Sequence, residues 1–227
     1  MIKDSMARII VKVILVLCLP LLLLLSNVHL LLTPGFIRYE YSKPHFPDAI
    51  SYNDTERLSL AEATLHYLRS NEQADYLATL QTQGRAVYNT REIKHLVDVK
   101  TVMNTALWLH KICVLLCLLA IAFSWQDSEA RRNALLAIYQ GCFAFLILLV
   151  TIGVLAYTKF DVFFTYFHRL FFEGNSWLFA FSDTLIQLFP LQFWVDATWI
   201  LVLLTVVEYI VVGVTAYALY RTRRFQR

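Results

Sequence analysis

The chain has 227 residues, of which 58% are hydrophobic and only 16% charged, and this composition excludes a soluble domain of that size. The net charge of +3 comes mostly from short basic flanks of apolar segments, so it does not indicate binding to nucleic acid. Four apolar segments, at about residues 9–32, 105–125, 135–158 and 196–220, each have roughly the 20 residues that a helix needs to cross the hydrocarbon layer. We expect an all-α membrane protein with a bundle of four transmembrane helices.

The first apolar segment exceeds the roughly 7–15 residues of a signal-peptide core and is followed by no Ala-x-Ala-like cleavage site, so we expect it to be retained. We divide the chain into three parts. Residues 1–32 form the first transmembrane segment, and residues 33–104 form a small, mainly helical extracellular cap that leads into the second span. Residues 105–227 hold spans two to four, with an outer, interfacial amphipathic segment at 159–195 before the last span.

Basic residues beside the spans predict the orientation in the membrane. Short flanks rich in Lys and Arg stay in the cytoplasm, and with four spans all the basic flanks fall on one side. Both termini are therefore expected in the cytoplasm, and residues 33–104 and 159–195 outside. The charges behind this prediction are Lys3, Arg8, Lys12, Arg131, Arg132, Arg221, Arg223, Arg224 and Arg227.

Within the cap, the pattern predicts short helices. Residues 36–41 alternate apolar or aromatic with charged side chains, which is a weak strand signal. Apolar residues recur at spacings of three and four over residues 54–70, which predicts an amphipathic helix, and a second short helix is expected over residues 73–82. The cap is too short and too poor in large apolar residues for a separate domain, so we expect it to rest on the bundle.

A long helix is expected to enter the second span. Asn89 and Glu92 form a capping pair, in which the amide accepts from the first turn and the carboxylate reaches back. Neither Gly nor Pro occurs from there to Trp125, so one helix should carry the chain from the cap through the span.

The segment before the last span combines an aromatic helix face with a short helix. The aromatic face is suited to lie in the headgroup region or to line an acyl groove. The alternative interpretation is an aromatic belt that anchors the end of the third span. Ser182 is expected to cap a short helix that runs to Phe189. The aromatic face consists of Phe160, Phe163, Phe164, Phe167 and Phe171.

Two histidines in polar motifs are the candidate catalytic residues, because imidazole carries protons near neutral pH. On a helix, Arg91, Glu92 and Asp98 would share one side with His95, where a carboxylate can fix the imidazole tautomer. An ordinary charged surface helix has the same spacing. His168 lies in a run of phenylalanines, where amphipathic packing is the simpler interpretation. Both histidines adjoin a span on the same predicted side, which favours acid–base chemistry on a lipid.

Other chemistries fit less well. Glu92-x-x-His95 is half of a carboxylate-bridged di-metal motif that occurs once here, and His95, His168 and Asp98 are an alternative set of ligands for one metal ion. The four cysteines lie inside the spans and indicate buried packing. Glu208 falls near mid-bilayer, with no basic partner evident at that depth.

The two motifs resemble those of the bacterial lipoprotein intramolecular transacylases, the Lit family. The resemblance covers the four-span layout with one large outer segment after the first span. Its first block is Tyr88-Asn89-x-Arg91-Glu92-Ile93-x-His95-x-x-Asp98-Val99-Lys100. Its second block is His168-Arg169-x-Phe171-Phe172, followed by Trp177, Asp183, Leu185-Ile186, Phe189-Pro190, Phe193 and Asp196.

The resemblance implies an enzyme that moves the sn-2 acyl chain of a diacylglyceryl-modified lipoprotein to the α-amino group of its N-terminal cysteine. His95 and His168 would then be a base and acid pair, without assignment of which does which. Asp98 or Glu92 would orient His95, and Arg91 or Arg169 would stabilise the oxyanion or hold the headgroup region. The remaining candidate residues are Tyr88, Asn89, Trp177 and Asp183. The partners would be lipoproteins and membrane lipids, with no cofactor and no metal.

Two other classes stay open at this point. One is a non-catalytic membrane protein whose outer motifs bind a partner. The other is a metal-dependent lipid or peptide hydrolase. A non-catalytic protein should keep its function when both histidines are replaced, whereas an enzyme should lose it. Stoichiometric zinc in the purified protein would favour the metal-dependent hydrolase.

Overall fold

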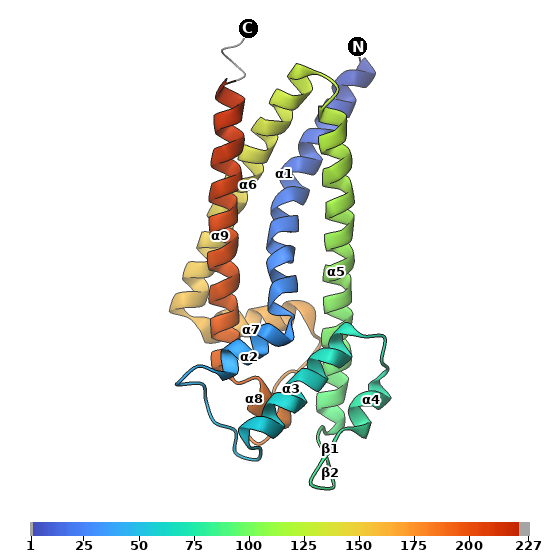
Figure 1. Cartoon of the computed structure of the whole chain (residues 1–227), viewed down its shortest axis with the longest axis vertical. Coiled ribbons are helices and arrows are strands. Elements are labelled where there is room, and N and C mark those ends of the chain that lie inside the picture. The colour runs from blue at the N-terminus through green and yellow to red at the C-terminus, as the bar shows by residue number, and fades with distance from the viewer. Residues whose placement is uncertain (1, 223–227) are drawn as a thin grey trace. The chain divides into compact units, whose positions relative to one another are not determined.

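The structure is a computed structural model that describes residues 2–222, with side chains described from Met6 onward. Of the flanking charges that predict orientation, the Lys3 side chain and residues Arg223, Arg224 and Arg227 lie outside this range. Within it, four helices are long and apolar enough to cross a membrane, which confirms the expected class (Figure 1). They are α1 (Ile2–Leu31), α5 (Thr90–Ser124), α6 (Ser128–Thr158) and α9 (Leu191–Thr222).

The chain contacts divide into two compact units. Unit 1 holds Met1–Val28, Ala106–Leu155 and Ile200–Arg227, and unit 2 holds His29–Thr105 and Ala156–Trp199. Helix α5 has 35 residues, roughly 52 Å of helix, which exceeds the hydrocarbon thickness of about 30 Å. Its charged first part, through Lys100, precedes the apolar part, so we take residues 105–124 as its membrane-spanning segment.

In unit 1, α1 and α6 approach each other closely at a glycine. Pro20 lies inside α1 and has no N–H to donate to the carbonyl of Val16. A Cβ atom added to Gly141 of α6 would lie 2.6 Å from that same carbonyl oxygen. Small residues at helix interfaces are the usual means of close packing in membranes, and here only glycine fits the observed backbone.

A polar contact inside the bundle joins α1 to α9. The buried Asn27 side chain donates through Nδ2 to Glu208 Oε2 at 2.8 Å and to Thr205 Oγ1 at 3.1 Å. Glu208 therefore has an amide partner rather than a basic one. The sequence shows this carboxylate but not its partner, because Asn27 lies at the far end of the chain.

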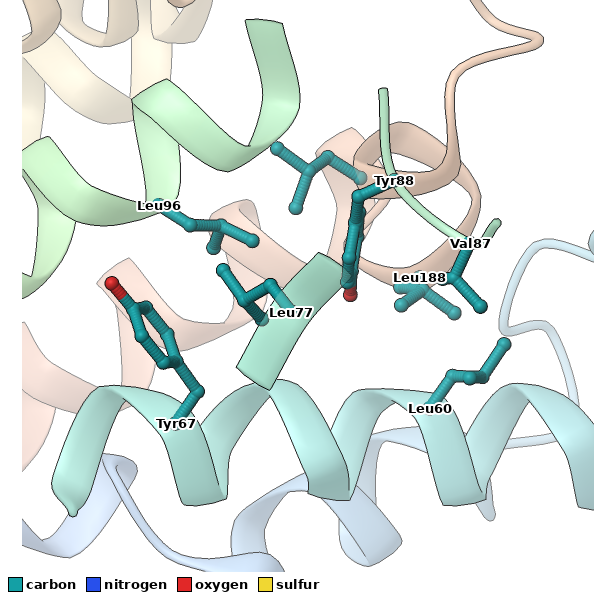
Figure 2. Close-up of a cluster of buried hydrophobic side chains, with 8 residues drawn as sticks. Leu60, Tyr67, Leu77, Val87, Tyr88, Leu96 and Leu188 are labelled. Carbon is teal, nitrogen blue, oxygen red and sulfur yellow. The ribbon is translucent and has the colours of Figure 1, made fainter. Parts of the chain in front are cut away.

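Unit 2 contains short elements around a hydrophobic cluster. The helices are α2 (Pro34–Tyr41), α3 (Asp54–Arg69), α4 (Ala74–Thr79), α7 (Phe160–Phe171) and α8 (Thr184–Leu188), and β1 (Gln81–Thr82) pairs antiparallel with β2 (Arg85–Ala86). Figure 2 shows side chains of α3 directed toward those of α4, α5 and α8. The buried members are Leu60, Tyr67, Leu77, Val87, Tyr88, Leu96, Leu185 and Leu188.

An ion cluster fixes α2 to the first turns of α9. Lys43 Nζ donates to both oxygens of Glu40, at 2.8 and 2.9 Å, and to Asp196 Oδ2 at 2.7 Å. The Glu40 side chain is fully buried, so the lysine stabilises a carboxylate that burial alone would destabilise. Gln192 donates to the other oxygen of Asp196.

Three local predictions are wrong. Residues 36–41 form helix α2 rather than a strand, because Thr33 Oγ1 accepts from Phe36 N and Pro34 occupies the first turn. The helix expected over residues 73–82 ends at Thr79, and residues 81–86 form a hairpin whose turn has Gly84 at φ +74°. Helix α8 is preceded by Asp183 at the N-cap position, not by Ser182.

The other helices follow the sequence pattern. Helix α3 starts at a capping box in which Asn53 and Glu56 satisfy each other's backbone N–H groups. Helix α5 runs unbroken from Thr90 to Ser124, and α7 covers the predicted aromatic segment.

We predict that Gly141→Ala lowers the free energy of unfolding by about 1–3 kcal/mol, because overpacking forces α1 and α6 apart. Thermal unfolding in detergent measures this effect. Gly35→Ala is the matched control, since a Cβ there would lie at an ordinary 3.8 Å from Thr33. An unchanged melting temperature for Gly141→Ala would show that the two helices do not pack as closely as described.

Candidate active site

His95 lies in the second turn of α5, and its side chain is only 8% exposed. Its imidazole is surrounded by aromatic rings: the ring centroid of Phe172 lies 4.9 Å away and that of Phe179 lies 5.3 Å away, edge-on. The buried Nδ1 atom has no hydrogen-bond partner among the residues that the structure describes. One nitrogen of this imidazole is therefore held in an apolar environment.

His168 lies in the last turn of α7 and has a defined tautomer. Its Nδ1–H donates to the carbonyl oxygen of Phe164 at 2.7 Å, so the neutral ring carries its lone pair on Nε2. The rings of Phe164 and Trp177 lie 4.0 and 4.8 Å from the imidazole. Phe172 contacts this histidine too, at 5.5 Å.

The two histidines come together from distant parts of the chain. Their ring centroids are 6.3 Å apart and their planes differ by 19°, so the two motifs converge. In the described part of the chain no hydrogen bond joins the two rings. A proton would therefore pass between them through an intervening water or substrate atom.

Burial keeps both imidazoles neutral near pH 7. It lowers the pKa of His95 to about 4, with a smaller contribution from the nearby charge on His168. Burial also lowers the pKa of His168, and the hydrogen bond to Phe164 partly offsets that effect because the carbonyl stabilises the imidazolium. Of the two, His168 has the environment that better supports a bound proton.

Glu92 connects the two motifs and does not contact His95 by a hydrogen bond. Its Oε2 atom accepts from Asn89 N at 2.9 Å, and Asn89 Oδ1 accepts from the N–H groups of Arg91 and Glu92, which confirms the capping pair. Its Oε1 atom accepts from Leu185 N at 2.8 Å. Both oxygens of this 1% exposed carboxylate are thus used by backbone N–H groups.

Asp98 is half-buried one turn after His95. Among the described residues it makes no hydrogen bond or ion pair, and none joins it to the imidazole. The sequence predicts that Glu92 or Asp98 orients His95. In the structure, the rings of Phe172 and Phe179 contact the imidazole, and neither carboxylate does so by a hydrogen bond.

Arg91 holds the irregular segment that covers His95. Its Nη2 donates to Asp183 Oδ2 at 2.8 Å, and its guanidinium lies 5.1 Å from the ring of Phe179. Asp183 also accepts from Ala180 N at 2.7 Å and from Asn89 Nδ2 at 3.4 Å. Because Phe179 is the ring that packs on His95, this ion pair positions part of the wall of the site.

The other predicted residues have different places. Tyr88 is buried in the hydrophobic cluster, where its hydroxyl contacts Thr64 Oγ1. The Trp177 Nε1–H donates to Gly174 O at 3.2 Å, and the ring faces His168. Arg169 is exposed, and no ion pair to it occurs in the described part of the chain. Sequence reasoning missed Phe179, because it lies in an irregular stretch without periodicity.

No group of three or more His, Cys, Asp or Glu side chains within residues 2–222 is arranged to hold a metal ion. In particular, His95, His168 and Asp98 do not form the ligand set that the sequence allows.

The four spanning helices and the converging pair of histidines define an integral membrane protein with a candidate acid–base site. The family model for lipoprotein intramolecular transacylase Lit matches residues 13–194. The chain belongs to this family.

An uncharacterised protein of Aquifex aeolicus is 31% identical over 193 residues, which cover 84% of this chain and 86% of the relative. The chain is similar in fold to the in meso structure of the integral membrane transacylase Lit of Bacillus cereus, with a TM-score of 0.71 and 16% identity over 99% of this chain and 97% of that one. A structure of that protein with one histidine replaced by alanine gives a TM-score of 0.67 and 15% identity over 99% and 96%.

We predict that acidification between about pH 6.5 and about pH 4 lowers the free energy of unfolding, in part through His95. In this range the unfolded chain binds a proton that the folded imidazole does not, so the stability is fully present above the unfolded pKa and declines as pH falls toward the folded one. His95→Phe should reduce this slope in thermal unfolding at a series of pH values. His168→Asn should keep most of the part that His95 contributes, because burial is a larger cause of the lowered His95 pKa than the charge on His168. Equal slopes for the wild type and His95→Phe would contradict the prediction.

Proposed function

We propose that this protein is a lipoprotein intramolecular transacylase of the bacterial plasma membrane. It moves the sn-2 acyl chain of the diacylglyceryl group to the α-amino group of the N-terminal cysteine, which gives the lyso-form lipoprotein. The observation that carries the proposal is the 6.3 Å approach of the buried imidazole of His95 and the half-buried imidazole of His168 in a chain of the transacylase family.

The reaction forms one amide bond and breaks one ester bond. An α-amine with a pKa near 8 is mostly protonated, so it first loses a proton before it attacks the ester carbonyl carbon. The tetrahedral intermediate then loses a second proton from nitrogen, the bond to the sn-2 oxygen breaks, and that oxygen gains a proton. When the substrate starts as an ammonium, one proton is released overall.

The environments of the two histidines support different roles. His168 is the base: its Nε2 lone pair accepts the proton from nitrogen, and the Phe164 carbonyl stabilises the resulting imidazolium. The same imidazolium then protonates the departing glyceryl oxygen. His95 stays neutral and uses its N–H to stabilise the oxyanion of the tetrahedral intermediate.

The aromatic face of α7 is suited to contact the lipid part of the substrate. The ring of Phe160 contacts those of Phe163 and Phe164, and the ring of Phe167 contacts that of Phe171. The imidazole of His168 contacts Phe164 and Phe167. Exposed apolar side chains continue this surface, and such a helix partitions into the membrane interface. They are Tyr166, Phe167, Leu170 and Phe171.

We predict that His168→Ala lowers lyso-lipoprotein formation about 10²–10⁴-fold, because a positioned acid or base contributes that much. His95→Ala should lower it about 10²–10³-fold, as the loss of an oxyanion donor does. Mass spectrometry of lipoprotein N-termini, in cells with and without this protein, measures the conversion. The double variant should be little worse than either single one, as expected for residues that act as a unit. His45→Ala, in an exposed loop, is the matched control and should retain activity.

Three outcomes would favour other functions. Full conversion by the double variant would remove both histidines from the mechanism and support a non-catalytic role. Loss of activity with EDTA and recovery with zinc would support a metal-dependent hydrolase. Release of free fatty acid without an N-acylated cysteine would show hydrolysis in place of transfer.

We further predict that both termini are cytoplasmic and that the histidine site faces the exterior. The described flanks Arg8, Lys12, Arg131, Arg132 and Arg221 carry this orientation through the positive-inside rule. Reporter fusions after Ser70 and after Arg132 should report opposite sides of the membrane. Fusions that report the same side would contradict the orientation.

A further inference from the structure

The two motif blocks contain four carboxylates, of which Asp196 is bonded to Lys43 and Gln192. Of the other three, two have both oxygens bonded within the chain. Glu92 accepts from two backbone N–H groups, Asn89 N and Leu185 N. Asp183 accepts from Arg91, Asn89 and Ala180 N. These hydrogen bonds hold the segments together and engage both oxygens of each carboxylate.

Asp98 is the third, and it is different. It is half-buried, and in the described part of the chain it has no hydrogen bond and no ion pair. Lys94, four residues earlier on the same helix, is exposed and forms no ion pair with it there. The oxygens of Asp98 are therefore available as acceptors for a donor from outside the chain.

The helix places Asp98 beside His95 on the side toward the span. Residues three apart on a helix have Cβ atoms about 5–6 Å apart. Asp98 also lies about 4.5 Å further along α5 toward its membrane-spanning segment. A lipid-anchored group that reaches His95 from the membrane would pass this carboxylate.

We infer that Asp98 binds the α-ammonium group of the N-terminal cysteine of the lipoprotein substrate and sets the nitrogen beside the histidines. This inference rests on the proposed function and names the residue that recognises the acyl acceptor. The neutral histidine pair does not repel an approaching cation, and Arg91, the guanidinium next to it, is already paired with Asp183. The bound ammonium gives one proton to His168 Nε2, which releases it to solvent, and the free amine then attacks the ester.

Binding of substrate analogues that cannot react tests this inference. The probes are a dialkylglyceryl-cysteinyl peptide with ether links, which has no ester to transfer, and the same peptide with an acetylated α-amino group. Wild-type protein in detergent should bind the free amine about tenfold more tightly than the acetylated peptide, as a charge-assisted hydrogen bond predicts. Asp98→Asn should bind both equally, and Asp98→Glu should keep a preference for the amine.

Turnover of the ester-linked peptide is the second measurement. Asp98→Asn should raise KM about tenfold and change kcat less, because a binding contact is lost. Glu173→Gln, which removes an exposed carboxylate of the nearby loop, is the matched control and should match the wild type. Phosphatidylethanolamine carries the same ammonium chemistry. If adding it to phosphatidylcholine micelles displaced the free-amine peptide, the bound group would be a lipid headgroup and the inference would be wrong.

The two proposals fail in different ways. An amine preference that survives in Asp98→Asn, or a loss of kcat at unchanged KM, would overturn the role of Asp98 whatever the activity. An amine preference lost in Asp98→Asn while the wild type transfers no acyl chain would instead reject the transacylase and keep the ammonium site.

Discussion

The buried carboxylate of Glu92 is the interaction on which the site depends. One oxygen closes the first turn of α5 through Asn89 N, and the other accepts from Leu185 N at the start of α8. Removing such an acceptor would leave two N–H groups without partners in an apolar environment, a cost of about 1–3 kcal/mol for each. Because His95 follows one turn later on α5, the same bonds that join the motifs also fix where the imidazole projects.

A second set of contacts builds the wall around the histidines from the segment between α7 and α8. Arg91 and Asp183 fix Phe179 against His95, and Phe172 packs on both imidazoles. These rings exclude water, which keeps the imidazoles neutral and strengthens electrostatic interactions with a substrate. The site is therefore a pair of neutral imidazoles surrounded by aromatic rings, at the end of the aromatic face of α7.

The intramembrane contact of Asn27 with Thr205 and Glu208 has a different role. It lies in unit 1, away from the histidine motifs in sequence, and supplies a polar bond between α1 and α9. Interhelical bonds of this kind contribute about 0.6–2 kcal/mol in membranes. The close approach of α1 and α6 at Gly141 provides the complementary, apolar type of packing.

The sequence by itself determined the four spans, the capped start of α5, the aromatic face of α7 and the pair of histidines. Each of these depends on patterns within a few residues, where helix spacing places side chains on one face. It did not determine α2 as a helix, because residues 36–41 alternate apolar and charged side chains as a strand does, although Thr33 is in place to cap a helix. Only the tertiary structure decided that Glu92 bonds Leu185, that Arg91 pairs with Asp183 and that Phe179 covers His95. These partners meet through an irregular segment without periodicity, so neither local propensity nor spacing specifies them. The tertiary structure also decided that Asp98 has no partner among the described residues, because this depends on the positions of all the neighbouring side chains.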